Sequence, residues 1–519
     1  MILRIGGLLM AGIAAMAAAG AEAPKQVDFT VPAGVAAWQG GSRAQVADST
    51  ERTPDDEATV RVQLAGDPAP DERFSERNSL TLTELAGRPQ DLADWRVVVA
   101  SFWLKPLTAS PEPLLAVLRR GYGETVPLAG DAWRRVEIRT WGPAPLYLRE
   151  VRQIAFRTAL PPAGTAFLIG PVQFRVEERL LRWRPAAGGD FAVNGLWWLK
   201  ENEGAFIRLP RRVAGVNRGV WNCAQHPAGG RIRFRTDSTT LKLRVDHGND
   251  GFPWPMMSSM AMAGIELYEG PPGNSVFRWV ATPVSAKEPY ELSVPVPTDG
   301  KLHEYTLYLP MYAKLAALDL GLDPEARIEP PGDFRQPRPI VFYGTSFVQG
   351  GCASRGSMNF PAIVGRRLGM DIVNLGFAGD GQCELEIGEC MAEIEASCFV
   401  MGPILNNLPL MRERYAPFVA ALRRRWPETP ILLMTRLHTV GQQTPYAVND
   451  LVREVHAAMR AAGDRNVHLF DSFPLYGDGD FYPTADGVHP SDHGFMLIGD
   501  ALAPALAGIL GLAGQPAVP

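Results

Sequence analysis

The chain has 519 residues, of which 46% are hydrophobic and 21% are charged, and its formal net charge is −5. This composition is typical of globular proteins, and the length allows about two to four domains. A nucleic-acid-binding protein is excluded, because the net charge is weakly negative and no stretch of Lys and Arg could neutralise a phosphate backbone. The five cysteines lack C-x-x-C spacing, which argues against a disulfide framework and a thiolate metal site.

Residues 1–23 have the pattern of a secretory signal peptide. Arg4 supplies the positive charge, an apolar stretch rich in Ala and Gly follows, and Ala21-Glu22-Ala23 has the small residues of a cleavage site. The apolar stretch falls short of the roughly 20 strongly apolar residues that a membrane span requires. We therefore expect cleavage after Ala23, a secreted or periplasmic mature protein, and no membrane anchor after cleavage.

Residues 24–190 are predicted to form a β-sandwich of the jelly-roll kind. Short alternating runs such as 95–103 and 133–141 are separated by Pro, Gly and Asp, and they lack a helical period. Residues 185–190, Pro-Ala-Ala-Gly-Gly-Asp, have the composition of a domain boundary. We expect the first domain to end there.

A second β-sandwich is predicted for residues 191–335. Ile232 and Phe234 alternate with arginines in residues 231–235, and residues 241–245 repeat the period of two. We expect these two strands to form a hairpin over a core. Residues 264–268 and 305–310 are predicted to be further strands of the same sandwich.

Residues 336–512 change to alternating strands and helices. Five short apolar runs are predicted strands, and apolar residues recur at helical spacing between Met411 and Trp426 and between Val448 and Met459. Together these elements predict a three-layer α/β domain, with a parallel sheet covered on both faces. The five apolar runs are residues 339–343, 371–375, 398–401, 431–434 and 467–470.

Polar or glycine-rich segments follow four of the predicted parallel strands. Residues 344–346 (Gly-Thr-Ser) follow the first strand, 376–379 (Gly-Phe-Ala-Gly) the second and 406–407 (Asn-Asn) the third, while 486–489 (Asp-Gly-Val-His) lie beyond the last. Ligands of open α/β sheets bind beyond the carboxyl ends of the strands. These segments are therefore expected to meet at one site.

Their side chains match the requirements of a serine nucleophile. Such a hydroxyl requires a base that accepts its proton, a carboxylate that orients the base, and preorganised donors for the developing oxyanion. We expect Ser346 to be the nucleophile, His489 the general base and Asp486 its orienting carboxylate. The backbone N–H groups of Ser346 and Gly379 and the side-chain amide of Asn406 are expected to form the oxyanion hole.

The same segments, in the same order, resemble the four sequence blocks of the SGNH (GDSL-like) hydrolases. Residues 374–379 (Asn-Leu-Gly-Phe-Ala-Gly) extend the second block, and Pro490 completes the fourth. Upstream, residues 264–268 (Gly-Ile-Glu-Leu-Tyr) resemble the G-x-D-L-Y signature of a β-domain that precedes certain SGNH carbohydrate esterases. The resemblance covers about residues 191–511 and implies a flavodoxin-like catalytic domain. Residues 24–190 are similar to carbohydrate-binding jelly rolls in pattern only.

The chain departs from the family pattern at two positions. Thr345 replaces the common Asp of the first block, as in some esterases of this kind, and Gly402 replaces an Asp that often begins the third block. The second departure leaves two assignments for the third oxyanion donor, Asn406 or Asn407. His489 with His493 and Asp486 could also mimic a metal cluster, but we expect no metal or cofactor, because Pro490 favours a fixed loop and no further ligands lie at metal-binding spacing.

The resemblance implies an exported serine esterase that removes O-acyl groups, acetyl above all, from a polysaccharide or oligosaccharide. An acylated carbohydrate is thus the expected partner. Two alternatives remain: a lysophospholipase or thioesterase that acts on lipid acyl esters, and a non-catalytic glycan-binding protein. Gly402 alone supports the second alternative, whereas the complete set of Ser346, His489 and Asp486 argues against it.

Overall fold

The structure is a computed structural model in which the chain divides into two compact units, residues 1–180 and residues 181–519. The described residues are 26–31, 38–40, 44–64, 79–82, 96–108, 114–119, 122–126, 128, 130–140, 155–157, 165–178, 181–251, 255–283, 285, 289–297, 299–439, 446–477 and 483–512. The expected signal peptide, residues 1–23, lies outside this part of the chain. Within it, no helix is long and apolar enough to cross a membrane.

The N-terminal unit consists of two antiparallel sheets in its described residues. The expected strands near residues 95–103 and 133–141 are present as β6 and β9, which pair with each other. Phe102 and Leu104 of β6 and Ile138 of β9 are fully buried. One sheet contains β1 (Gln26–Val31), β3 (Ala44–Ser49), β4 (Thr59–Leu64), β6 (Arg96–Pro106), β9 (Arg134–Thr140), β11 (Ala166–Ile169) and β12 (Val172–Glu178). The other contains β2 (Trp38–Gly40), β5 (Ser79–Leu82), β7 (Leu114–Arg119), β8 (Tyr122–Val126) and β10 (Ala155–Arg157).

The C-terminal unit begins with a β-domain of two antiparallel sheets that share one core. One sheet contains β13 (Arg182–Pro185), β16 (Leu241–Asp246), β19 (Tyr290–Val294) and β21 (Ala317–Leu322). The other contains β14 (Ala192–Asn194), β15 (Arg231–Thr236), β17 (Glu266–Glu269), β18 (Val276–Val280), β20 (His303–Tyr308) and β22 (Ile328–Glu329). Three short helices complete the described part of the domain: η5 (Arg211–Val213), α2 (Arg218–Ala224) and α3 (Ser259–Ala263). Because β13 pairs with β21, this domain starts at Leu181, before the Pro- and Gly-rich segment at 185–190.

The predicted hairpin of residues 231–235 and 241–245 is wrong. Both segments are strands, but β15 pairs with β14, β20 and β22, whereas β16 pairs with β19 and β21. The two strands face each other across the core, where Ile232 and Phe234 of β15 meet the apolar side chains of β16. Alternating burial is the same for a hairpin partner and for a strand in the opposite sheet, so the period of two could not distinguish them.

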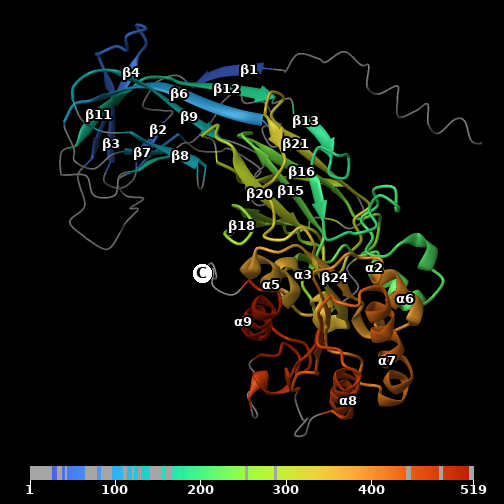
Figure 1. The fold of residues 1–519 in the computed structure, drawn as a ribbon. Coiled ribbons are helices and arrows are strands. Elements are labelled where there is room, and N and C mark those ends of the chain that lie inside the picture. The colour runs from blue at the N-terminus through green and yellow to red at the C-terminus, as the bar shows by residue number, and fades with distance from the viewer. Residues whose placement is uncertain are drawn as a thin grey trace, which may run out of the picture. The chain divides into compact units, whose positions relative to one another are not determined.

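The α/β domain follows, and all five predicted parallel strands are present. Their order is β24-β23-β25-β26-β27, and every neighbouring pair is parallel. Figure 1 shows α5 and α9 on one side of this sheet and α6 and α7 on the other. The strands are β23 (Ile340–Gly344), β24 (Ile372–Gly376), β25 (Cys398–Met401), β26 (Ile431–Met434) and β27 (Val467–Phe470). The helices are α4 (Ser346–Gln349), η6 (Gly356–Met358), α5 (Phe360–Leu368), η7 (Ala378–Asp380), α6 (Leu385–Met391), α7 (Leu408–Arg425), α8 (Ala447–Ala461), η8 (Phe473–Tyr476) and α9 (Asp492–Ile509).

The β-domain and the α/β domain pack into one body. Apolar residues of the β-domain, including Met311 and Tyr312, belong to the same buried cluster as strands β23 to β26. Buried polar contacts cross the same boundary: Arg231 forms an ion pair with Asp371, and the backbone N–H of Ser357 donates to Glu266 at 2.7 Å. The β-domain therefore lies against the sheet edge at β24.

Candidate active site

Ser346 lies where β23, the second strand of the parallel sheet, ends. Gly344 is the last residue of β23, Thr345 is the N-cap of α4, and Ser346 is the first residue of that short helix. The hydroxyl of Thr345 donates to the carbonyl of Pro403 at 3.1 Å, which ties the turn to the neighbouring strand exit. Ser346 is thereby held, partly exposed, on a turn that is otherwise buried.

His489 and Asp486 are presented by one tight loop before α9. The N–H of Ala485 donates to the carbonyl of His489 at 2.8 Å, so the chain reverses within five residues. Gly487 has a φ of 85°, a left-handed conformation that glycine adopts without steric cost. The Oδ1 of Asp486 accepts the backbone N–H groups of His489 at 2.7 Å and Val488 at 3.0 Å.

The three predicted residues form one chain of hydrogen-bonding contacts. His489 Nδ1 lies 2.7 Å from Asp486 Oδ2, and His489 Nε2 lies 3.0 Å from Ser346 Oγ. Partial burial acts to raise the pKa of Asp486, but the hydrogen bonds from His489 and Val488 outweigh it and hold that pKa below its ordinary value. The carboxylate is thus ionised at neutral pH and faces the ring nitrogen remote from the serine. This arrangement suits an imidazole that accepts a proton from Ser346.

The serine and histidine open into a cavity of about 420 Å³. A Cβ atom on Gly351 would lie 3.1 Å from His489 Cδ2, 3.2 Å from Ser346 Cβ and 3.3 Å from the hydroxyl of Tyr312, so a side chain at this position would crowd these three groups. The cavity is lined by Met256, Met257, Tyr312, Ser346, Gly351, Cys352, Ala378, Gly379, Asp380 and His489.

Gly379 lies in this cavity, on the turn that follows β24. The N–H of Phe377 donates to the carbonyl of Gly344 at 3.0 Å, which holds the turn beside the serine. Ala378 has a φ of 45°, a left-handed conformation that is uncommon for a residue other than glycine. The backbone N–H groups of Ser346 and Gly379 thus belong to neighbouring turns at the same end of the sheet.

The two candidate amides of the third strand exit lie elsewhere. Asn406 is exposed, and Asn407 is the N-cap of α7, where its side-chain oxygen accepts the N–H of Leu410 at 3.3 Å. Neither side chain lines the cavity. At Gly402 a Cβ atom would lie 2.4 Å from a methyl group of Val348, so Val348 occupies the space that a side chain at this position would need. A third oxyanion donor remains a prediction.

The two domains of this body match two family profiles in sequence. Residues 337–507 match the profile of the GDSL-like lipase/acylhydrolase family, and residues 181–328 match the GxDLY profile, described as the N-terminus of SGNH-hydrolase-type esterases. The α/β domain belongs to the GDSL-like lipase/acylhydrolase family. The protein is accordingly a carboxylic ester hydrolase of the SGNH type, and the predicted resemblance is confirmed.

Two solved structures have a similar fold over about two thirds of this chain. A candidate GDSL-like lipase from Bacteroides ovatus is 26% identical, with a TM-score of 0.56 over 64% of this chain and 98% of its own. The salicylyl-acyltransferase SsfX3 from a tetracycline biosynthetic pathway is 21% identical, with a TM-score of 0.53 over 65% of this chain and 99% of its own. A search of curated protein sequences finds no match to the esterase.

One group of potential metal ligands is present in the described part of the esterase. Cys352, Asp486 and His489 offer ligand atoms within 4.8 Å of one another. His489 already faces Asp486 through Nδ1 and Ser346 through Nε2, as described above. Cys352 Sγ lies 4.0 Å from Asp486 Oδ2, and burial raises the pKa of its thiol to about 11, with the Asp486 charge adding to the effect. At neutral pH the thiol is therefore protonated.

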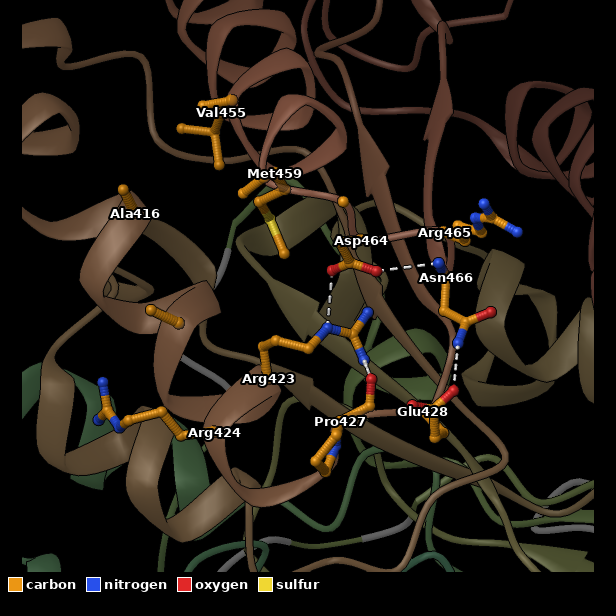
Figure 2. A pocket seen from close by; sticks show the side chains of 14 residues that line it. Ala416, Arg423, Arg424, Pro427, Glu428, Val455, Met459, Asp464, Arg465 and Asn466 are labelled. Atoms are coloured by element: carbon orange, nitrogen blue, oxygen red, sulfur yellow. Dashed lines mark hydrogen bonds and ion pairs between the residues drawn. The ribbon is translucent and has the colours of Figure 1, made fainter.

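A cavity of about 840 Å³ lies in another part of the esterase, between α7 and α8 (Figure 2). Arg423 donates to Asp464 at 2.7 Å, and the N–H of Asn466 donates to the same carboxylate at 2.9 Å, so several of its polar groups bind each other. Glu428 and Asn466 precede β26 and β27, which places this cavity at the amino ends of the strands. The candidate active site lies at the opposite, carboxyl ends.

The sequence analysis did not identify the β-domain residues that line the esterase site. Met256, Met257 and Tyr312 belong to the β-domain and form one wall of the cavity. Asp380 was also missed, although it directly follows Gly379 and could have been found by extending the second block by one residue. His438, which follows β26, contacts the carbonyl of Gly477 and the ring of Phe473 and does not line the cavity.

Proposed function

We propose that the protein is a serine esterase that removes short O-acyl groups, acetyl above all, from a carbohydrate. Ser346 is the nucleophile, His489 the general base and then acid, and Asp486 the carboxylate that fixes the imidazole. The observation that carries this proposal is the continuous contact chain from Asp486 through His489 to Ser346, at 2.7 and 3.0 Å, at the wall of a cavity. A serine triad requires this geometry.

The reaction follows from these positions. Ser346 Oγ attacks the ester carbonyl carbon while His489 Nε2 accepts its proton, and the carbonyl π electrons move to the oxygen. The resulting oxyanion accepts hydrogen bonds from the N–H groups of Ser346 and Gly379. The C–O bond to the alcohol then breaks, and His489 returns its proton to the leaving oxygen. Water, deprotonated by His489, hydrolyses the acyl-serine by the same steps and restores the free hydroxyl.

The cavity favours a short acyl group on a hydroxyl-rich alcohol. Its volume of about 420 Å³ is near the small end of ligand cavities, which leaves little space for a long lipid chain beside the alcohol. Met256, Met257 and Tyr312 offer an apolar wall for an acyl methyl group, and Asp380 offers a carboxylate that accepts hydrogen bonds from sugar hydroxyls. The resemblance of residues 191–511 to two-domain carbohydrate esterases supports the same substrate class.

A comparison of acyl chain lengths tests this proposal. The purified protein should hydrolyse nitrophenyl acetate with a higher kcat/KM than the octanoate, and it should release acetate from acetylated glycans. Ser346→Ala is the matched control for contaminating esterases. A preference for octanoate or longer esters would instead identify a lysophospholipase or thioesterase. Absence of hydrolysis combined with glycan binding would identify a non-catalytic binding protein.

We also propose that the protein is exported to the periplasm or the medium. The charged, apolar and small-residue regions of residues 1–23 support this proposal. Expression of the full chain in a bacterial host, followed by fractionation and N-terminal sequencing, tests it directly. Export predicts a mature N-terminus at Pro24 outside the cytoplasm. An uncleaved chain in the cytoplasm would contradict it.

A further inference from the structure

Arg208 is a fully buried cation at the boundary between the β-domain and the α/β domain. It lies between β14 and η5, only 1% of its surface is exposed, and in the described part of the chain no carboxylate forms an ion pair with it. Burial lowers the pKa of Arg208 to about 10, with smaller opposing effects of Cys223 and Tyr312, so the guanidinium remains charged at neutral pH. A buried charge without a counter-ion is costly and requires several good hydrogen bonds.

Backbone carbonyl groups from both domains provide these hydrogen bonds. On the β-domain side, Arg208 Nη2 donates to the carbonyl of Cys223 at 2.6 Å and Nε donates to that of His226 at 2.7 Å. On the α/β side, Nη1 donates to the carbonyls of Asn374 at 3.0 Å and Gly376 at 2.5 Å. The guanidinium also lies over the ring of Phe377, 4.9 Å from its centre. Arg208 thus joins the β-domain to the end of β24.

The segment that Arg208 holds leads directly to Gly379. Asn374 connects this segment to α4, because its side chain donates to the carbonyl of Val348 at 2.7 Å. The same side chain accepts the N–H of Gly376 at 2.9 Å. Two residues after Gly376, Ala378 adopts the left-handed conformation noted above, which persists only where the surrounding structure fixes the backbone. Arg208 holds the carbonyl groups four and two residues before this strained residue, those of Asn374 and Gly376.

We infer that Arg208 is a positioning residue of the β-domain. It holds the backbone N–H of Gly379 beside that of Ser346, so that the two groups form the oxyanion hole. This inference rests on the proposed roles of Ser346 and Gly379. The β-domain then has a function in catalysis beyond any contact with the substrate, because its arginine holds one of the two oxyanion turns. Loss of the four hydrogen bonds lets the turn relax, and a misplaced donor weakens transition-state binding more than ground-state binding.

Substitution of Arg208 and of a matched arginine tests the inference. Arg208→Met removes the charge and all hydrogen-bond donors from a side chain that remains long. Arg208→Lys keeps the charge but replaces the planar guanidinium group by an ammonium group. Arg231→Met is the control, because Arg231 is also buried at this boundary and donates to the carbonyl of Ile372 at 2.8 Å, at the start of the same strand. Arg231 therefore supports β24 at the end remote from Gly379.

We expect Arg208→Met to lower kcat by roughly 10- to 100-fold with KM changed by less than about threefold, and Arg208→Lys to give an intermediate loss. The inhibition constant of an alkyl boronic acid, whose tetrahedral adduct with serine mimics the intermediate, should rise in proportion to the loss of kcat/KM. Arg231→Met should lower the thermal midpoint by a similar amount but keep kcat within about twofold of the wild type.

Three results would overturn the inference: a folded Arg208→Met or Arg208→Lys variant with wild-type kcat, an unchanged boronic-acid constant in a slow variant, or an equal loss of kcat in Arg231→Met. If Arg208→Met does not fold, the lysine variant alone decides between these outcomes. Ser346→Ala separates this inference from the proposed function. An inactive Ser346→Ala beside fully active Arg208 variants would reject only the positioning role, whereas an active Ser346→Ala would reject the triad itself.

Discussion

Asp486 binds His489 in two ways at once, because its Oδ1 accepts the backbone N–H of His489 at 2.7 Å while its Oδ2 faces the Nδ1 of the same residue at 2.7 Å. The first contact fixes the loop, and the second fixes the ring. Gly487 allows the turn between them through its left-handed backbone. Orientation of the imidazole toward Ser346 is therefore a property of four consecutive residues.

Asp486→Asn tests the contribution of the carboxylate. The amide oxygen of Asn can still accept the two backbone N–H groups, so the loop should keep its shape. Its NH₂ group, however, would face Nδ1 and favour the wrong imidazole tautomer. We expect kcat to fall by up to about 10⁴-fold with little change in thermal stability. A loss of only about tenfold would make Asp486 an auxiliary residue, and an unchanged kcat and pH profile would remove it from the site.

Ser346→Ala tests the nucleophile. Removal of the hydroxyl leaves only substrate binding and the oxyanion donors, so turnover should fall by roughly 10⁴-fold or more. A serine-directed phosphonate should label the wild-type protein at Ser346, as identified by peptide mass spectrometry, and should not label the variant. A variant that retains a tenth of the wild-type activity, with contaminating esterases excluded, would contradict the assignment.

The third oxyanion donor can be assigned by comparing two adjacent asparagines. Asn406→Ala should lower kcat by about 10²- to 10³-fold with little change in KM if its amide reaches the oxyanion in the substrate complex. Asn407→Ala should instead lower the free energy of unfolding by about 1 kcal/mol, because it removes the N-cap of α7, and should leave kcat nearly unchanged. Steady-state kinetics and denaturant unfolding of both variants provide the comparison. The reverse ranking of kcat values would show that Asn407 is the donor.

Chelation tests the group of potential metal ligands formed by Cys352, Asp486 and His489. We expect EDTA to leave the rate of ester hydrolysis unchanged, because a triad mechanism uses His489 as a free base rather than as a metal ligand. The measurement is the hydrolysis rate after prolonged dialysis against EDTA. Loss of activity that zinc restores would show that these residues hold a catalytic metal.

His226 predicts a pH dependence of stability. Burial is the main cause that lowers the pKa of His226 from 6.5 to about 4, and the charge of Arg208 adds to it. Between about pH 4 and 6.5 the unfolded chain binds a proton at this residue and the folded chain does not, so the free energy of unfolding should rise with pH in this window, by at most about 3 kcal/mol. Urea unfolding at several pH values in this range gives the free energy of unfolding as a function of pH. This free energy should rise less steeply with pH for His226→Gln than for the wild type. The same rise of the free energy of unfolding with pH in the variant and the wild type would contradict this prediction.

The sequence alone was sufficient to predict the α/β domain and the order of its functional segments along the chain. The strands around residues 340–344 and 372–376 are continuous apolar runs, because a parallel sheet is buried on both faces. The carboxyl ends of such strands meet at one edge, so Ser346 and Gly379 were expected to lie together from local pattern alone. The contact of Asp486 with His489 was also predictable, since both lie on one short turn.

Only the tertiary structure decided which segments of the β-domain lie in contact with one another and with the site. The period of two in β15 and β16 predicts which side chains are buried but not which strands pair with each other. The two strands lie in opposite sheets. Tyr312 lines the active-site cavity and Arg208 contacts the end of β24 through packing between residues far apart in the sequence, which leaves no local signal. Their roles depend on where two domains meet, and that position is fixed by the fit of the whole buried surface rather than by any one segment.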